Sequence, residues 1–186
     1  MAPQPSIRSA ERWIYLCWAL LVLAYLALRT AHVPWVNDEC ASLHFYVEKG
    51  EFLPYRAHWD ANNHVLSSAV GIALHQVFGL SLAASRAGSL LAFVLFAGCA
   101  WLLAARVREA VIRWGLLLAL TACPFMLDFF ALFRGYALEL AFLLLAVVGL
   151  VRLLERWRTR HLLLTLLALL LANASVLALL PTWATL

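Results

Sequence analysis

The stretch AGSLLAFVLFAGCAWLLAA, residues 87–105, contains no charged side chain and a single hydroxyl, that of Ser89. A bilayer span needs about 20 mostly apolar residues, with a range of about 17–25. A helix on the surface of a water-soluble domain would instead carry polar residues along one face. The stretch therefore predicts a transmembrane helix.

Four more apolar runs lie on either side of this stretch: Trp13–Leu28, Trp114–Leu127, Gly135–Val151 and Leu162–Leu186. The run at 114–127 is short for a span and needs its flanking residues. The first run follows a short basic segment, as in a signal peptide, but no small-x-small cleavage site comes after it, which favours a retained helix. We predict an all-α, polytopic transmembrane helix bundle of about five spanning helices, with residues 1–186 in one transmembrane domain.

The overall composition supports this class of protein. The chain is 65% hydrophobic and 13% charged, whereas soluble domains are about 45–50% apolar and about 25% charged. The formal net charge is +4, but the basic residues flank the apolar runs, so membrane topology explains them and no nucleic-acid partner is expected. Three of the cysteines lie inside apolar runs, so neither a disulfide framework nor a CxxC metal site is indicated.

The segment Val65–Leu80 is apolar but carries serine, glycine and histidine on one side at helical spacing. It is short for a full span, so we predict an interfacial helix on the external side. The first external loop then covers about 31–83. Arginine clusters at 106–113 and 152–160 indicate cytoplasmic loops. If Val65–Leu80 spans the membrane, the positive-inside rule instead places the N-terminus outside. The excess of basic residues on the cytoplasmic side is nearly the same in both topologies.

The first external loop carries half of the acidic residues of the chain and four of its six histidines. A connection of this length is often functional. Asp38 and Glu39 are either solvated loop acids or a carboxylate pair at the membrane surface that acts as general base or metal ligand. A denser group, His58, Asp60, Asn63 and His64, is either the turn and cap before the next helix or a set of binding residues.

A second, short external loop carries charge next to the membrane. It runs from Asp128 through Arg134 to Tyr136. An external arginine opposes the positive-inside bias, which favours an anionic ligand such as a lipid phosphate. Glu139, one turn into the next helix, is placed to pair with Arg134 or Arg86. Because no His-x-x-x-His pair occurs, we assign no metal ligands, although a divalent metal ion stays open.

These motifs, taken in order, resemble the N-terminal module of the GT-C glycosyltransferases, the polytopic group of protein O-mannosyltransferases and aminoarabinose-transferase-like enzymes. The resemblance covers about residues 13–155. Asp38-Glu39 follows the first helix, and Asn63-His64-Val65-Leu66 is similar to the family's His-Pro-Pro-Leu. The stretch 84–89 is similar to the Arg-Leu-Pro-Ser that opens the family's next helix. The stretch 128–138 is similar to Asp-Tyr-Phe-Ser-x-Ala-Arg-Gly-Tyr-x-Leu. Val65 stands where a proline is usual, so the entry into that helix is open.

The resemblance implies inverting transfer of a sugar from a polyprenyl-phosphate donor to a lipid, glycan or protein acceptor. Asp38 would be the general base, and Glu39 its supporting acid or acceptor-positioning group. The implied substrate-binding residues are His58, Asp60, Asn63, His64, Arg86, Asp128, Arg134 and Tyr136. No cofactor is required. The expected location is the bacterial inner membrane with a periplasmic site, and the chain is expected to be the N-terminal part of a longer enzyme.

Two other classes fit a polytopic chain. A transporter subunit should carry its polar residues near the bilayer midplane, whereas here they concentrate in the loops. A non-catalytic membrane component, or a degenerate fragment, needs no acidic group in a loop.

Overall fold

The structure is a computed structural model that describes residues 9–58 and 63–176. All regular structure in these two ranges is helical, which confirms the predicted all-α class. The elements are α1 (Ser9–His32), α2 (Asn37–Ser42), the π-helix η1 (Leu43–Val47), α3 (Val65–Phe78), α4 (Leu82–Ala104), α5 (Ala110–Thr121), α6 (Pro124–Ala131), α7 (Gly135–Glu155) and α8 (Thr159–Ser175).

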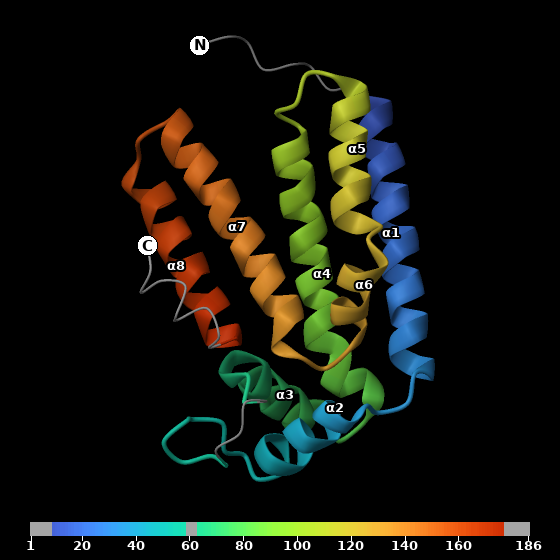
Figure 1. Ribbon diagram of the computed structural model, residues 1–186, viewed down its shortest axis with the longest axis vertical. Helices are drawn as coiled ribbons and strands as arrows, with labels where there is room; N and C mark the ends of the chain where they lie inside the picture. Colours follow the sequence, from blue (N-terminus) through green and yellow to red (C-terminus); the bar gives the residue numbers. More distant parts are fainter. Residues whose placement is uncertain (1–8, 59–62, 177–186) are drawn as a thin grey trace.

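The long helices form a bundle that is closed at one end by short ones. Helices α1, α4, α5, α7 and α8 run along the long axis, and α2 and α3 lie across one end (Figure 1). The connections α4–α5 and α7–α8 lie at the end where α1 begins, and α2, η1, α3 and the α6–α7 connection lie at the opposite end (Figure 1). This alternation matches the loop pattern that the arginine clusters predict.

The core surrounds α4. Phe93 and Phe96 on α4 pack on Phe130 of α6, with ring centroids 5.4 and 5.1 Å apart. Alanines line the contact between α4 and α7, including the fully buried Ala137 and Ala141. Small residues allow two helix backbones to approach closely, which is the usual way that helices associate inside a membrane.

Three helices are long and apolar enough to cross a membrane, namely α1, α4 and α7, and a fourth span results if α5 and α6 together count as one. Helix α8 is shorter in the described residues, and the end of the predicted run at 162–186 lies outside them. The structure therefore confirms that the chain has several helices able to span a membrane. The count of five stays a prediction.

The run predicted at 114–127 is not one straight helix. Helices α5 and α6 meet at an angle of 46°, and the break falls at 122–123, directly before Pro124 at the start of α6. Proline has no N–H to donate and its ring clashes with the carbonyl four residues earlier, so a helix kinks or stops there. The apolar composition of the run 114–127 did not predict this bend.

The predicted first external loop is the segment between α1 and α4, and it contains α2, η1 and α3. Helix α3 is too short to count among the candidate spans and lies across the end of the bundle (Figure 1). It ends at Gly79, whose φ of 73° lies in the left-handed region that glycine enters without strain. The chain then turns into α4, where the Ser81 hydroxyl accepts a hydrogen bond from the Ala84 N–H at 3.1 Å.

The arrangement predicts that positions 48 and 109 lie on opposite sides of the membrane. Both residues are exposed, Glu48 after η1 and Glu109 before α5. With the native cysteines replaced, a cysteine at only one of these positions should react with an impermeant thiol reagent in intact cells. Both should react after the membrane is opened. Reaction of both positions in intact cells would exclude this topology.

Candidate functional site

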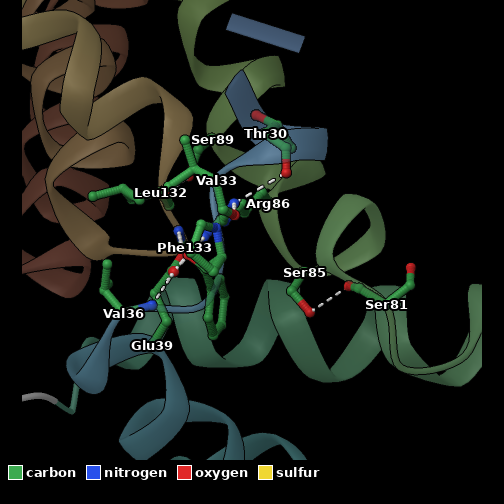
Figure 2. A network of polar contacts seen from close by, with 11 residues as sticks. Thr30, Val33, Val36, Glu39, Ser81, Ser85, Arg86, Ser89, Leu132 and Phe133 are labelled. Carbon is green, nitrogen blue, oxygen red and sulfur yellow. Dashed lines mark hydrogen bonds and ion pairs between the residues drawn. The ribbon is translucent and has the colours of Figure 1, made fainter. Parts of the chain in front are cut away.

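A buried ion pair lies where α2 meets the start of α4. Arg86 and Glu39 have fully buried side chains, and their charged groups meet twice, with Nε–Oε1 at 2.8 Å and Nη2–Oε2 at 2.5 Å (Figure 2). Two parallel N–H···O bonds of this kind hold arginine and carboxylate in a fixed relative orientation. The pair therefore locks α2 onto α4.

Arg86 also organises the chain that leaves α1. Its Nη1 donates to the carbonyls of Thr30 at 3.0 Å and Val33 at 2.7 Å, and its Nη2 donates to the carbonyl of Pro34 at 3.0 Å. A guanidinium has five N–H groups, and with the two bonds to Glu39 all five are used. Arg86 thus has no donor left for a substrate in this arrangement, and we assign it a positioning role instead of the predicted direct contact.

Each carboxylate oxygen of Glu39 likewise accepts two hydrogen bonds. Besides Arg86, its Oε1 accepts from the Phe133 N–H at 2.5 Å and its Oε2 from the Val36 N–H at 3.1 Å (Figure 2). Phe133 belongs to the connection between α6 and α7, which Ser89 also holds by a 2.6 Å bond to the Leu132 carbonyl. Glu39 therefore ties three chain segments together, and its role as a supporting acid or acceptor-positioning group stays a prediction.

The neighbouring carboxylate faces outward. Asp38 forms an ion pair with Arg134, and their side chains are 45% and 23% exposed. The Arg134 guanidinium also lies over the Tyr136 ring, 5.6 Å from its centroid, and its buried Nε has no hydrogen-bond partner in the described residues. The structure thus joins the predicted base, the predicted phosphate contact and Tyr136 at one partly exposed place.

A third ion pair lies at the same end of the bundle. Asp128 on α6 pairs with Arg29 near the end of α1 at 2.7 Å. Arg29 was not among the predicted site residues, because its position in the last turn of an apolar run matched an ordinary helix end. The pairing expected for Glu139 is not what the structure shows, since Arg134 and Arg86 both pair with acids of α2.

His64 lies directly before α3 and is buried between α7 and the end of α8. Its ring packs edge-on against Tyr136, with centroids 5.2 Å apart. Burial lowers the pKa of His64, and a hydrogen bond with the Ser175 backbone offsets part of this shift. A neutral imidazole at this place packs against Tyr136 and adds no positive charge to the site.

Gly135 makes this packing feasible. A Cβ on Gly135 would overlap the Ser175 carbonyl oxygen and lie 2.7 Å from His64 Cγ. We expect Gly135→Ala to lower the free energy of unfolding by about 1–3 kcal/mol, the usual cost of overpacking. Gly115→Ala is the control, because its Cβ would meet nothing within 4 Å. Thermal unfolding in detergent measures both, and equal stability of the two variants would contradict the close contact.

The other predicted residues lie further out or cannot be placed. His58 is exposed and stacks on Phe45 with centroids 4.2 Å apart. Asn63 is buried and donates to the Phe52 carbonyl at 3.2 Å, while its Oδ1 has no partner in the described residues. Asp60 lies outside the described residues. Within the described part of the chain, neither His58 nor Asn63 forms a hydrogen bond or ion pair with Asp38 or Arg134.

Among the residues that the structure describes, no three side chains of histidine, cysteine, aspartate or glutamate come close enough to hold a metal ion. The Asp38–Arg134 pair itself offers one carboxylate and one guanidinium, both partly exposed. A carboxylate can accept a proton, and a guanidinium can stabilise a phosphate or another anion.

Comparison of the chain with family models, with curated proteins and with solved structures finds no match. The fold and the site define a helical protein with several apolar spans and a polar pair at one end of the bundle.

Proposed function

We propose that this protein is a GT-C-like membrane glycosyltransferase that moves a sugar from a polyprenyl-phosphate donor to an acceptor hydroxyl. The observation that carries the proposal is the accessible Asp38–Arg134 ion pair, which rests on the buried Glu39–Arg86 pair. It combines the two groups that this transfer needs, a proton acceptor and a phosphate-binding cation, at the end of apolar helices where a lipid phosphate would lie.

In the proposed reaction Asp38 takes the proton of the acceptor hydroxyl as its oxygen attacks the anomeric carbon. A bond forms between the acceptor oxygen and this carbon, and the bond from the carbon to the phosphate oxygen breaks on the opposite side, so the configuration inverts. The electron pair of the broken bond stays on the departing polyprenyl phosphate. Arg134 stabilises the negative charge that develops there.

The ion pair between the two groups is the resting arrangement in this mechanism. While Asp38 is bound to Arg134, its carboxylate is occupied by the guanidinium and is not free for an acceptor hydroxyl. A donor phosphate competes for the guanidinium, and its arrival releases the carboxylate for the acceptor. Binding of the donor would thus activate the base.

The acceptor is a lipid, a glycan or a protein, and the proposed setting is the bacterial inner membrane with residues 32–64 and 128–136 on the periplasmic side. In this setting a cysteine at position 48, and not one at 109, reacts with an impermeant reagent from outside. No cofactor is part of the proposed reaction.

We expect Arg134→Ala to weaken binding of a polyprenyl phosphate by about ten- to a hundredfold, the loss of one charge-assisted phosphate contact. Lys49→Ala is the control, since Lys49 is an exposed cation between η1 and α3, at the same end of the bundle, and packs its ammonium over Phe45. Equilibrium binding of a fluorescent short-chain polyprenyl phosphate to purified protein measures both variants. Equal affinities would remove Arg134 from the proposed donor site.

A non-catalytic role as a membrane component is a second candidate that one observation favours. The acidic residues Asp38, Glu39 and Asp128 all have arginine partners within the chain, which is also what a purely structural network requires. The two candidates differ at Asp38, because a structural pair tolerates an isosteric amide while a general base does not.

A further inference from the structure

Helices α1 and α4 leave a groove of about 430 Å³ between them on the outside of the bundle. Its lining is apolar along almost its whole length. The side chains of Leu16, Leu20 and Val94, which line it, are 44%, 55% and 52% exposed. Since both helices are candidate membrane spans, the groove faces the lipid.

One end of the groove carries a cation. Arg12, in the first turns of α1, is exposed and lines the groove. The adjacent acid, Glu11, is bound to Arg113 of α5 at 2.6 Å. The Arg12 side chain has no hydrogen-bond or ion-pair partner within residues 9–58 and 63–176. An apolar groove thus ends in an unneutralised positive charge, near the end of the bundle where α1 begins.

We propose that this groove binds one acyl chain of an anionic phospholipid, with the lipid phosphate against Arg12. The charge at one end and the apolar walls beyond it match the two parts of such a lipid. The groove volume lies within the range of small-molecule sites, whereas a helix with its side chains is about 10–12 Å across and would lie over the groove instead of inside it. A long arginine side chain reaches the headgroup level readily.

This lipid site is separate from the proposed sugar-transfer site. Arg12 lies near the start of α1, and Asp38 lies in α2, which follows the other end of that helix (Figure 1). The two sites therefore belong to opposite leaflets. The lipid proposal does not depend on the proposed function.

Gly98 offers a way to fill the groove. It lines the groove, and a Cβ added there would meet nothing within 4 Å. Gly98→Leu should therefore place its side chain in the space of the acyl chain without forcing α1 and α4 apart. Leu20→Trp fills the same space from α1, and serves if Gly98→Leu does not fold.

Native mass spectrometry of the purified chain tests the proposal with phosphatidylglycerol and phosphatidylcholine of identical acyl chains. We expect the wild-type protein to retain phosphatidylglycerol about fivefold more than phosphatidylcholine, the preference that one basic side chain confers. Arg12→Gln should retain both lipids equally, and Gly98→Leu or Leu20→Trp should lose the retained lipid. Arg108→Gln, which removes an exposed charge from the α4–α5 connection, should behave as wild type.

Equal retention of the two lipids by the wild-type protein would overturn the proposal. So would unchanged phosphatidylglycerol retention in a folded groove-filling variant, or loss of the preference in Arg108→Gln. A dimer that disappears when the groove is filled would show that a second copy of the chain occupies it, which also contradicts a lipid site.

Discussion

Asp38→Asn is expected to slow sugar transfer by about 10²–10⁴-fold, the usual contribution of a general base, and mostly through kcat. The amide keeps the size of the side chain and can still accept a hydrogen bond from Arg134, but it cannot take a proton at neutral pH. The fold should therefore survive. Initial rates of labelled-sugar transfer at matched membrane abundance measure the effect.

Glu48→Gln is the matched control for this variant. The Glu48 side chain is 47% exposed, close to the 45% of Asp38, and it too has a side-chain partner, His44, whose Nδ1 lies 3.2 Å from its Oε2. A general loss of surface charge would affect both variants alike. Retention of more than a tenth of the wild-type rate by Asp38→Asn, or an equal loss in Glu48→Gln, would show that Asp38 is not the base.

Arg86→Met is expected to lower the free energy of unfolding by about 3–5 kcal/mol, because it leaves the Glu39 charge buried without its partner. It also leaves the carbonyls of Thr30, Val33 and Pro34 without their donor. Thermal unfolding in detergent measures the loss. Adding Glu39→Leu should recover part of the stability, since removing both charges costs less than removing one.

Arg106→Met is the control for this change. Arg106 pairs with Glu155 at 2.6 Å at the other end of the bundle, and the two side chains are 23% and 33% exposed. Ion pairs that water reaches contribute about 0–1 kcal/mol. Similar losses in Arg86→Met and Arg106→Met would mean that the buried pair does not hold the connections together.

The sequence predicted the helical class and most helix positions because membrane spans follow from local composition. The apolar run 87–105 lies almost wholly within α4, and the polar segment between α1 and α4 holds the short helices α2, η1 and α3. The bend between α5 and α6 also has a local cause in the sequence, Pro124. The mean hydropathy of the run 114–127 does not reveal the bend, because it does not register that proline lacks a backbone N–H.

The partners of the charged residues could not be predicted in the same way. Glu39 lies 47 residues from Arg86 and 94 from Phe133, and nothing local states which acid meets which arginine. Asp38 and Glu39 are adjacent in sequence, yet successive residues of a helix point in different directions. One carboxylate therefore becomes accessible and the other fully buried. Their different roles follow from the packing of α2 on α4, which only the structure shows.

The most direct test of the central claim follows the donor instead of the acceptor. Native membranes that contain the wild-type protein in its complete, active assembly are supplied with a phosphate-labelled polyprenyl-phosphate sugar, and the release of sugar-free polyprenyl phosphate is measured. We predict release that depends on the protein, falls by about 10²–10⁴-fold in Asp38→Asn, and is unchanged in Glu48→Gln. Release at the same rate from wild-type and Asp38→Asn membranes would contradict the proposed transfer at this site.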